Sequence, residues 1–274
     1  MRKCQLVPQF RRNPTADQPR FLNTNLETAL IIEDDVDWDV HLRSSQLPLV
    51  ASRMRELVAR NAGAETVPPF SPDAYWGDLK TWEILYLGHC GDFFEPKHFA
   101  YLPHLIFSDP TLPAFNRLHT FTLSFLSKLG INEGERIVHR SYWPLCTFAY
   151  GLTRASAKRI LREFSREEEG GTPAYDVRIL EACRDLDWAC YSSNPELFHH
   201  MEAPSEIASV NKGTDDLGRV QRQTSEGTPN IACGARSDSL VTNDPETFMW
   251  LKSRVTEDGV CLVDQVEEDM SRWP

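Results

Sequence analysis

The chain has 274 residues, of which 41% are hydrophobic and 25% charged, and its formal net charge is -11. This composition is that of a globular protein that can bury a substantial core, and the negative charge argues against a nucleic-acid partner. No run of residues approaches the length of a membrane-spanning helix, and the amino terminus lacks the apolar stretch of a signal peptide. Taken alone, the chain is expected to be soluble and cytoplasmic.

Strands and helices are predicted in alternation along the chain. Residues 1–21 are rich in arginine and proline and are expected to form a loose basic arm. Short apolar runs predict strands at 28–32, 82–87, 146–150 and 188–191. Apolar residues at helical spacing predict helices at 49–60, 115–129, 153–164 and 176–186, and a weak one at 245–255. Residues 88–114 have an irregular pattern. The alternation favours an α/β fold with a single, mostly parallel sheet flanked by helices, over residues 22–200. Residues 201–274 are expected to be a flexible linker and a C-terminal extension.

The seven cysteines are scattered and form no Cys-x-x-Cys pair. An odd, widely spaced set argues against a zinc site or a compact disulfide framework. Most of them are expected to be reduced and half-buried in the core. The alternative that two of them form one long-range disulfide stays open.

The strand at 28–32 runs directly into three carboxylates, Glu33, Asp34 and Asp35. Burying an acidic cluster is costly unless it is paired or binds a metal. In open α/β sheets, ligands bind at the carboxyl ends of strands. Hard oxygen ligands there suit Mg²⁺ or Mn²⁺, which commonly hold a diphosphate. The alternative is that these acids cap a following helix or lie in solvent.

Two further acids, Asp37 and Asp39, follow the same strand and are better interpreted as caps or solvated residues. Their alternation with Asp35 raises the possibility of a calcium loop. Such a loop requires Gly at its sixth position and Glu at its twelfth. Val40 and Gln46 occupy those positions, so the calcium loop is rejected.

Five segments, taken together and in order, point to a family. They are 29–36 (ALIIEDDV), 82–88 (WEILYLG), 147–161 (TFAYGLTRASAKRIL), 173–177 (PAYDV) and 194–198 (NPELF). In this order they resemble glycosyltransferase family 25, which contains lipopolysaccharide and collagen galactosyltransferases, and fungal members most closely. The resemblance covers about residues 22–240.

The resemblance implies a GT-A-like fold and transfer of a sugar from a nucleotide diphosphate donor to a glycan or protein acceptor, with inversion. UDP-galactose is the common donor of the family. By matching position, Glu33, Asp34 and Asp35 would hold Mn²⁺ (or Mg²⁺) against the donor diphosphate. Asp35 is the expected metal ligand, and Glu33 is expected to contact the ribose or to support the metal.

Inversion also requires a general base on another element. Asp176 is the first candidate, and a plain helix N-cap is an equal alternative for it. Glu196 is the reserve candidate. His199 or His200 could complete the metal shell. Surface or packing roles are the more frequent ones for adjacent histidines, because neighbours on an extended strand point in opposite directions.

One departure from the family concerns the amino terminus. Family members normally begin well upstream of the acidic strand, and that part supplies a βαβ unit for the nucleotide base. The domain is therefore expected to be N-terminally truncated. The alternative function is a non-catalytic relative that acts as a binding protein. A metal-dependent hydrolase is disfavoured because no His-rich group of ligands lies near Asp35. The resemblance also allows a location in the Golgi or elsewhere in the secretory pathway.

Overall fold

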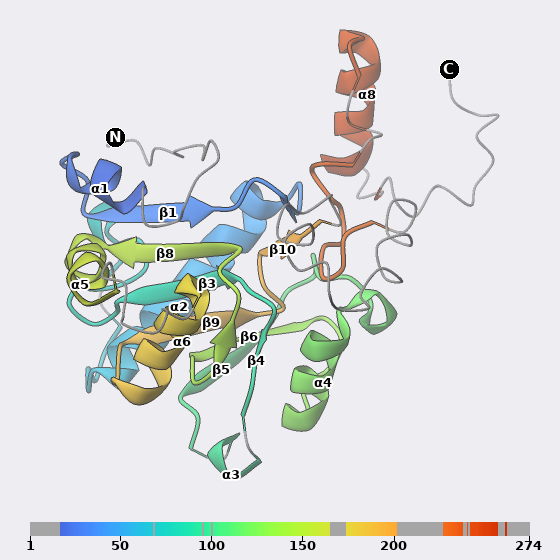
Figure 1. Cartoon of the computed structure of the whole chain (residues 1–274). Coiled ribbons are helices and arrows are strands. Elements are labelled where there is room, and N and C mark those ends of the chain that lie inside the picture. Colours follow the sequence, from blue (N-terminus) through green and yellow to red (C-terminus); the bar gives the residue numbers. More distant parts are fainter. Residues whose placement is uncertain are drawn as a thin grey trace, which may run out of the picture.

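The computed structural model describes residues 17–67, 69–94, 96–99, 101–164, 174–201, 227–237, 240, 242–256 and 261. These residues form a mixed α/β structure around a six-stranded sheet of order β1-β8-β3-β9-β6-β5 (Figure 1). Its strands are β1 (Thr28–Ile32), β3 (Ile84–Gly88), β5 (His104–Ser108), β6 (Glu135–Arg140), β8 (Ala149–Thr153) and β9 (Cys190–Asn194). Two ribbons accompany it, β2 (Val36–Trp38) with β10 (Phe198–His200) and β4 (Gly91–Asp92) with β7 (Pro144–Leu145). The α/β class is confirmed.

The expectation of a mostly parallel sheet is wrong. Among the neighbouring strands that the structure describes in this sheet, β3·β9 is the one parallel pair, and the pairs β1·β8, β3·β8, β6·β9 and β5·β6 are antiparallel. The alternating pattern suggested successive βαβ units. Instead, β8 enters between β1 and β3 and runs against both of them. Two strands of the six-stranded sheet were not predicted: β5 lies in the stretch assigned as irregular, and no strand was predicted where β6 lies. The four short strands of the ribbons were not predicted either.

The predicted helices are confirmed with shifted ends. They are α2 (Leu47–Asn61), α4 (Thr120–Leu129), α5 (Arg154–Phe164), α6 (Tyr175–Asp185) and α8 (Pro245–Thr256). Two short helices were not predicted: α1 (Asp17–Leu22) overlaps the expected loose arm, and α3 (Pro96–Phe99) lies in the stretch assigned as irregular. A π-helical turn (Leu42–Gln46) leads into α2, and short 3-10 turns occur at Pro72–Ala74 and Phe115–Arg117. The helix α4 ends where predicted, because Gly130 adopts a left-handed conformation and its N–H closes the last turn. Among the described helices, none has both the length and the apolar character that crossing a membrane requires.

The sheet lies between two helical layers (Figure 1). Along β3, Leu85 and Leu87 join a core cluster with Met54 and other residues of α2. The alternate residues Ile84 and Tyr86 join a second cluster, which contains apolar residues of α5 and α6. This alternation is the period of two expected for a strand with both faces covered. It explains why β3 is apolar throughout and buried at every position.

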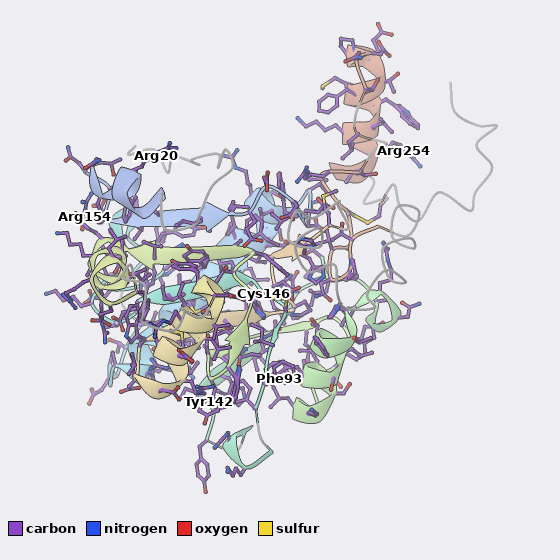
Figure 2. The ribbon with its side chains drawn as sticks, in the orientation of Figure 1. Arg20, Phe93, Tyr142, Cys146, Arg154 and Arg254 are labelled. Atoms are coloured by element: carbon purple, nitrogen blue, oxygen red, sulfur yellow. A yellow bond between two sulfur atoms is a disulfide. The ribbon has the colours of Figure 1, made fainter. Side chains whose placement is uncertain are left out.

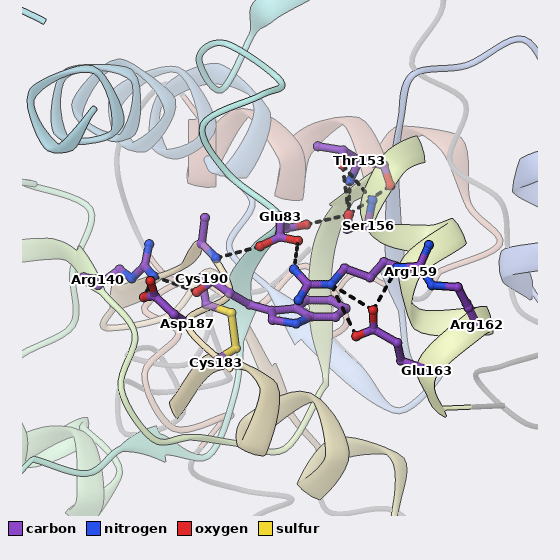
Figure 3. A network of polar contacts seen from close by, with 12 residues as sticks. Glu83, Arg140, Thr153, Ser156, Arg159, Arg162, Glu163, Cys183, Asp187 and Cys190 are labelled. Atoms are coloured by element: carbon purple, nitrogen blue, oxygen red, sulfur yellow. Dashed lines mark hydrogen bonds and ion pairs between the residues drawn. A yellow bond between two sulfur atoms is a disulfide. The ribbon is translucent and has the colours of Figure 1, made fainter. Parts of the chain in front are cut away.

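At the end of the sheet where β3 begins, Glu83 links three elements (Figure 3). One carboxylate oxygen pairs with Arg159 Nη1 of α5 at 2.7 Å, and the other accepts the N–H of Ala189 at 2.9 Å. The Arg159 guanidinium also lies 4.2 Å from the ring centroid of Trp188. At the same end, Arg154 (Figure 2) donates from Nε to the carbonyl of Leu26 and from Nη1 to that of Leu22, the last residue of α1. These contacts fix the start of β3. Strand β1 runs in the same direction as β3, so it ends on the opposite side of the sheet.

The cysteine expectation is also wrong. Three disulfides link Cys90 to Cys146, Cys183 to Cys190 and Cys233 to Cys261, with Cα–Cα distances of 5.4, 5.6 and 5.0 Å. Two of them join residues 56 and 28 positions apart, which only the folded chain brings together. The seventh cysteine, Cys4, lies outside the described residues. The odd number of cysteines was therefore a misleading signal, because six of the seven are paired.

Candidate functional site

The acidic turn at the end of β1 is held in place by backbone hydrogen bonds on both sides. Glu33 N–H donates to the carbonyl of Phe148, just before β8, at 2.8 Å. Met201 N–H, just after β10, donates to the carbonyl of Asp35 at 2.7 Å. The chain then continues as β2, which pairs antiparallel with β10 and sets His200 opposite Val36. The carboxyl end of β1 and the end of β10 therefore meet at one edge of the molecule.

Asp35 and His200 are brought into direct contact although they lie 165 positions apart. His200 Nε2 is 2.7 Å from Asp35 Oδ2, and the two side chains are 33% and 29% exposed. The His200 ring packs against Phe148, with centroids 5.2 Å apart. The hydrogen bond from His200 keeps the pKa of Asp35 below its usual value against the opposing effect of burial, and the charges of His200 and Arg236 act in the same direction. Asp35 is thus an ionised, partly accessible carboxylate.

Glu33 lies in the same cluster but behaves in the opposite way. Burial raises its pKa from 4.5 to about 7, and the neighbouring charge of Asp35 adds to this effect. The charge of Asp176 raises it further, whereas His200 lowers it. Strongly shifted carboxyl groups with named charge partners are typical of functional sites. At neutral pH Glu33 is therefore close to half protonated.

Asp176 comes close enough to this cluster for its charge to act on Glu33. It is the second residue of α6, and Ala174 occupies the N-cap position. Its Oδ1 accepts the N–H of its neighbour Val177 at 2.9 Å. The N-cap alternative is therefore wrong.

Asp37 and Asp39 have structural roles. Both are buried, and their carboxylates accept backbone N–H groups. Asp37 Oδ1 accepts from Arg236 at 3.0 Å, and Asp39 Oδ2 accepts from Cys233 at 2.9 Å. Both lie beyond the end of β1, as predicted, but the expectation that they are solvated is wrong, because both side chains are buried and Asp37 lies in β2. These acids anchor residues 228–236 to the acidic turn.

Glu196 and His199 form a second, separate cluster. Glu196 is fully enclosed and contacts His199 Nδ1, while its Oε1 accepts from Asn230 Nδ2 at 2.6 Å. Burial alone would raise the pKa of Glu196, but the charge and hydrogen bond of His199 hold it below its usual value. His199 thus turns to Glu196, while His200 turns to Asp35, as alternation along a strand requires. The structure groups Glu33, Asp35, Asp176 and His200. It separates Glu196 and His199 from them.

The remaining acid of the triplet, Asp34, is exposed, and its backbone carbonyl accepts from Arg236 Nη1 at 2.6 Å. The sequence pattern did not identify Arg236 or Asn230 as site residues. Both lie at the end of a polar, Gly- and Ser/Thr-rich stretch whose composition predicts a linker. Cys233, which lies between them, was the one local indication that this segment is fixed in place. Its disulfide partner, Cys261, cannot be identified from the sequence.

A divalent cation requires several oxygen or nitrogen ligands that converge on one point. Among the described residues, no three His, Cys, Asp or Glu side chains converge closely enough to enclose a metal. Asp35 and His200 do supply one carboxylate and one imidazole at a partly open position. Mg²⁺ and its analogues are commonly held by one or two protein ligands plus substrate phosphates and water. The residues therefore fit a cation that shares its ligands with a diphosphate, and do not fit an all-protein cage.

Comparisons with protein-family models, curated proteins and solved structures gave no match for this chain.

Proposed function

We propose that the chain is a metal-dependent glycosyltransferase that moves a sugar, with galactose the first candidate, from a nucleotide diphosphate to an acceptor hydroxyl with inversion. The observation that carries the proposal is the 2.7 Å contact between Asp35 and His200 beside the half-buried Glu33. The ordered resemblance of five segments to glycosyltransferase family 25 supports the same function.

Asp35 and His200 are the residues that would hold Mn²⁺ or Mg²⁺. A divalent cation there would offset the charge that develops on the leaving diphosphate. For this, Asp35 must be ionised, and the lowered pKa keeps it so. His200 must give up its hydrogen bond to Asp35 when both bind the same ion.

Asp176 is proposed as the general base that accepts the proton of the acceptor hydroxyl. It comes from α6, whereas the acidic turn follows β1, so an acceptor could lie between the two elements. Glu33 is proposed to contact the donor ribose. A carboxyl group with a pKa of about 7 can donate as well as accept a hydrogen bond at neutral pH.

The three disulfides support an oxidising location such as the secretory pathway, since disulfides persist there and are rare in the cytosol. A location in the secretory pathway is therefore proposed in place of the cytoplasmic one expected from the sequence.

The binding of UDP, measured by isothermal titration with and without Mn²⁺, tests the function. Wild type is expected to bind UDP only with Mn²⁺, and Asp35→Ala is expected to lose that binding. Asp185→Ala, an exposed acid at the other end of α6, serves as the control. Absence of UDP binding by wild type in either condition, or equal binding by Asp35→Ala, would contradict the proposal.

A further inference from the structure

The segment 228–236 closes over the acidic turn through regular backbone contacts. Ala235 N–H donates to the carbonyl of Trp38 at 2.8 Å, and Val40 N–H donates to that of Cys233 at 2.9 Å. An isolated antiparallel bridge joins Asp39 to Gly234. The segment therefore extends the β2·β10 ribbon, and its position is fixed relative to Asp35.

Three side-chain features hold this segment in register. Thr228 Oγ1 donates to Asp37 Oδ2 at 3.1 Å. Gly234 lies so close to the same oxygen that a Cβ there would overlap it. The disulfide from Cys233 to Cys261 joins a small core cluster with Leu251 of α8. Together these contacts pre-position the residue that follows, Arg236.

The guanidinium of Arg236 is aimed at the acidic turn. Its Nη1 donates to the carbonyls of Asp34 at 2.6 Å and Val36 at 3.0 Å, on either side of Asp35. The side chain is nevertheless exposed. Within the described part of the chain, Nε and Nη2 have no hydrogen-bond partner. An arginine fixed by one nitrogen, with further donors directed to solvent, is prepared to bind an oxyanion.

We propose that Arg236 binds the diphosphate of the donor, next to the cation held by Asp35 and His200. The inference rests on the proposed function and adds to it a residue from the C-terminal segment. The chemistry is complementary: phosphate oxygens that face the cation on one side meet guanidinium N–H groups on the other. Arginine suits this role because its planar fork donates two parallel hydrogen bonds to one phosphate.

A purely structural role is the competing explanation, because Arg236 also ties two carbonyls of the turn. The two roles differ in what they change. If Arg236 only holds the turn, its replacement disturbs Asp35 and weakens Mn²⁺ binding itself. If Arg236 binds phosphate, its replacement weakens diphosphate binding and leaves the affinity for Mn²⁺ alone unchanged or higher, since a neighbouring positive charge is removed.

The experiment measures the affinities for Mn²⁺ alone, for inorganic pyrophosphate with Mn²⁺, and for UDP with Mn²⁺. The variants are Arg236→Gln, Arg236→Lys and the control Arg60→Gln, an exposed arginine of α2. Arg236→Gln is expected to weaken pyrophosphate and UDP binding by about tenfold or more. Arg236→Lys is expected to restore part of the affinity, since it keeps the charge but not the fork. Thermal unfolding confirms that each variant is folded.

Unchanged pyrophosphate affinity in Arg236→Gln overturns the inference. So does a loss of affinity for Mn²⁺ alone that is as large as the loss of affinity for pyrophosphate. If wild type binds UDP, Asp35→Ala does not and Arg236→Gln still does, the proposed function stands and the role of Arg236 falls. If wild type binds neither pyrophosphate nor UDP, both fall. Should Arg236→Gln fail to fold, the comparison of Arg236→Lys with wild type decides, with unchanged affinity overturning the inference.

Discussion

Replacing Glu33 with glutamine is expected to stabilise the fold at alkaline pH and to leave its stability at acid pH nearly unchanged. The pKa of Glu33 rises from 4.5 to about 7, chiefly because burial disfavours the charged form and because Asp35 adds negative charge. The folded chain therefore keeps this proton to a higher pH than the unfolded chain. Below about pH 4.5 the ionisation of Glu33 does not change the free energy of unfolding. As the pH rises from 4.5 to about 7, this ionisation lowers the free energy of unfolding.

The size of the effect follows from the same two values. The pKa rises from 4.5 to about 7 and one pKa unit corresponds to about 1.4 kcal/mol, so ionised Glu33 costs at most about 3.5 kcal/mol, less the part that solvent screens at this half-buried position. Glutamine keeps nearly the same shape and carries no charge. Glu33→Gln is expected to recover most of that cost above neutral pH.

Urea unfolding at about pH 4 and about pH 8, with disulfides intact, measures the difference between the variant and wild type. Glu246→Gln, an exposed acid of α8, is the control and is expected to show no pH-dependent gain. Equal free energies for Glu33→Gln and wild type at both pH values would refute the reasoning, because they would mean that neither burial nor the charge of Asp35 penalises ionised Glu33 in the folded chain.

Two further predictions concern stability away from the cation ligands. Arg136 Nε pairs with Asp109 Oδ2 at 2.7 Å, with both side chains almost fully buried; Arg136→Met is expected to cost about 3–5 kcal/mol, because it leaves a buried carboxylate unpaired. Unfolding in urea checks this, and a loss below about 1 kcal/mol would contradict it. Gly234→Ala forces a Cβ onto Asp37 Oδ2 and is expected to cost about 1–3 kcal/mol. An unchanged Tm would show that the segment yields without strain.

The acidic turn could be predicted from the sequence because its signal is local. A β-branched run followed by Glu33, Asp34 and Asp35 identifies a strand and its carboxyl end without knowledge of the partners. The helices α2 and α6 were predicted for the same reason, since their apolar residues recur at helical spacing within a single segment.

The sheet direction and the cysteine pairing could not be predicted because they depend on distant partners. Nothing in the residues of β8 specifies that it enters between β1 and β3. In β6, charged Glu135, Arg136 and Arg140 flank a run of only two apolar residues. Arg136 is buried because distant partners, Asp109 above all, satisfy its guanidinium. The pairing of Cys90 with Cys146 likewise requires the fold.

The candidate site shows the same division. The contact of His200 with Asp35 was not predicted, and whether His200 binds a metal stays a prediction. The separate pairing of His199 with Glu196 is its counterpart on the opposite face. The position of Arg236 beside the acidic turn could not be predicted. It depends on the bridge between Asp39 and Gly234, which amino-acid composition does not reveal.

The release of UDP from UDP-galactose tests the central claim most directly. With Mn²⁺, wild type is expected to release UDP, through slow hydrolysis without an acceptor and faster with a suitable glycan. Asp35→Ala and a metal-free sample are expected to remain at background. No release by wild type from UDP-galactose or other UDP-sugars, with or without acceptor, would contradict the assignment of this site as a sugar-transfer centre.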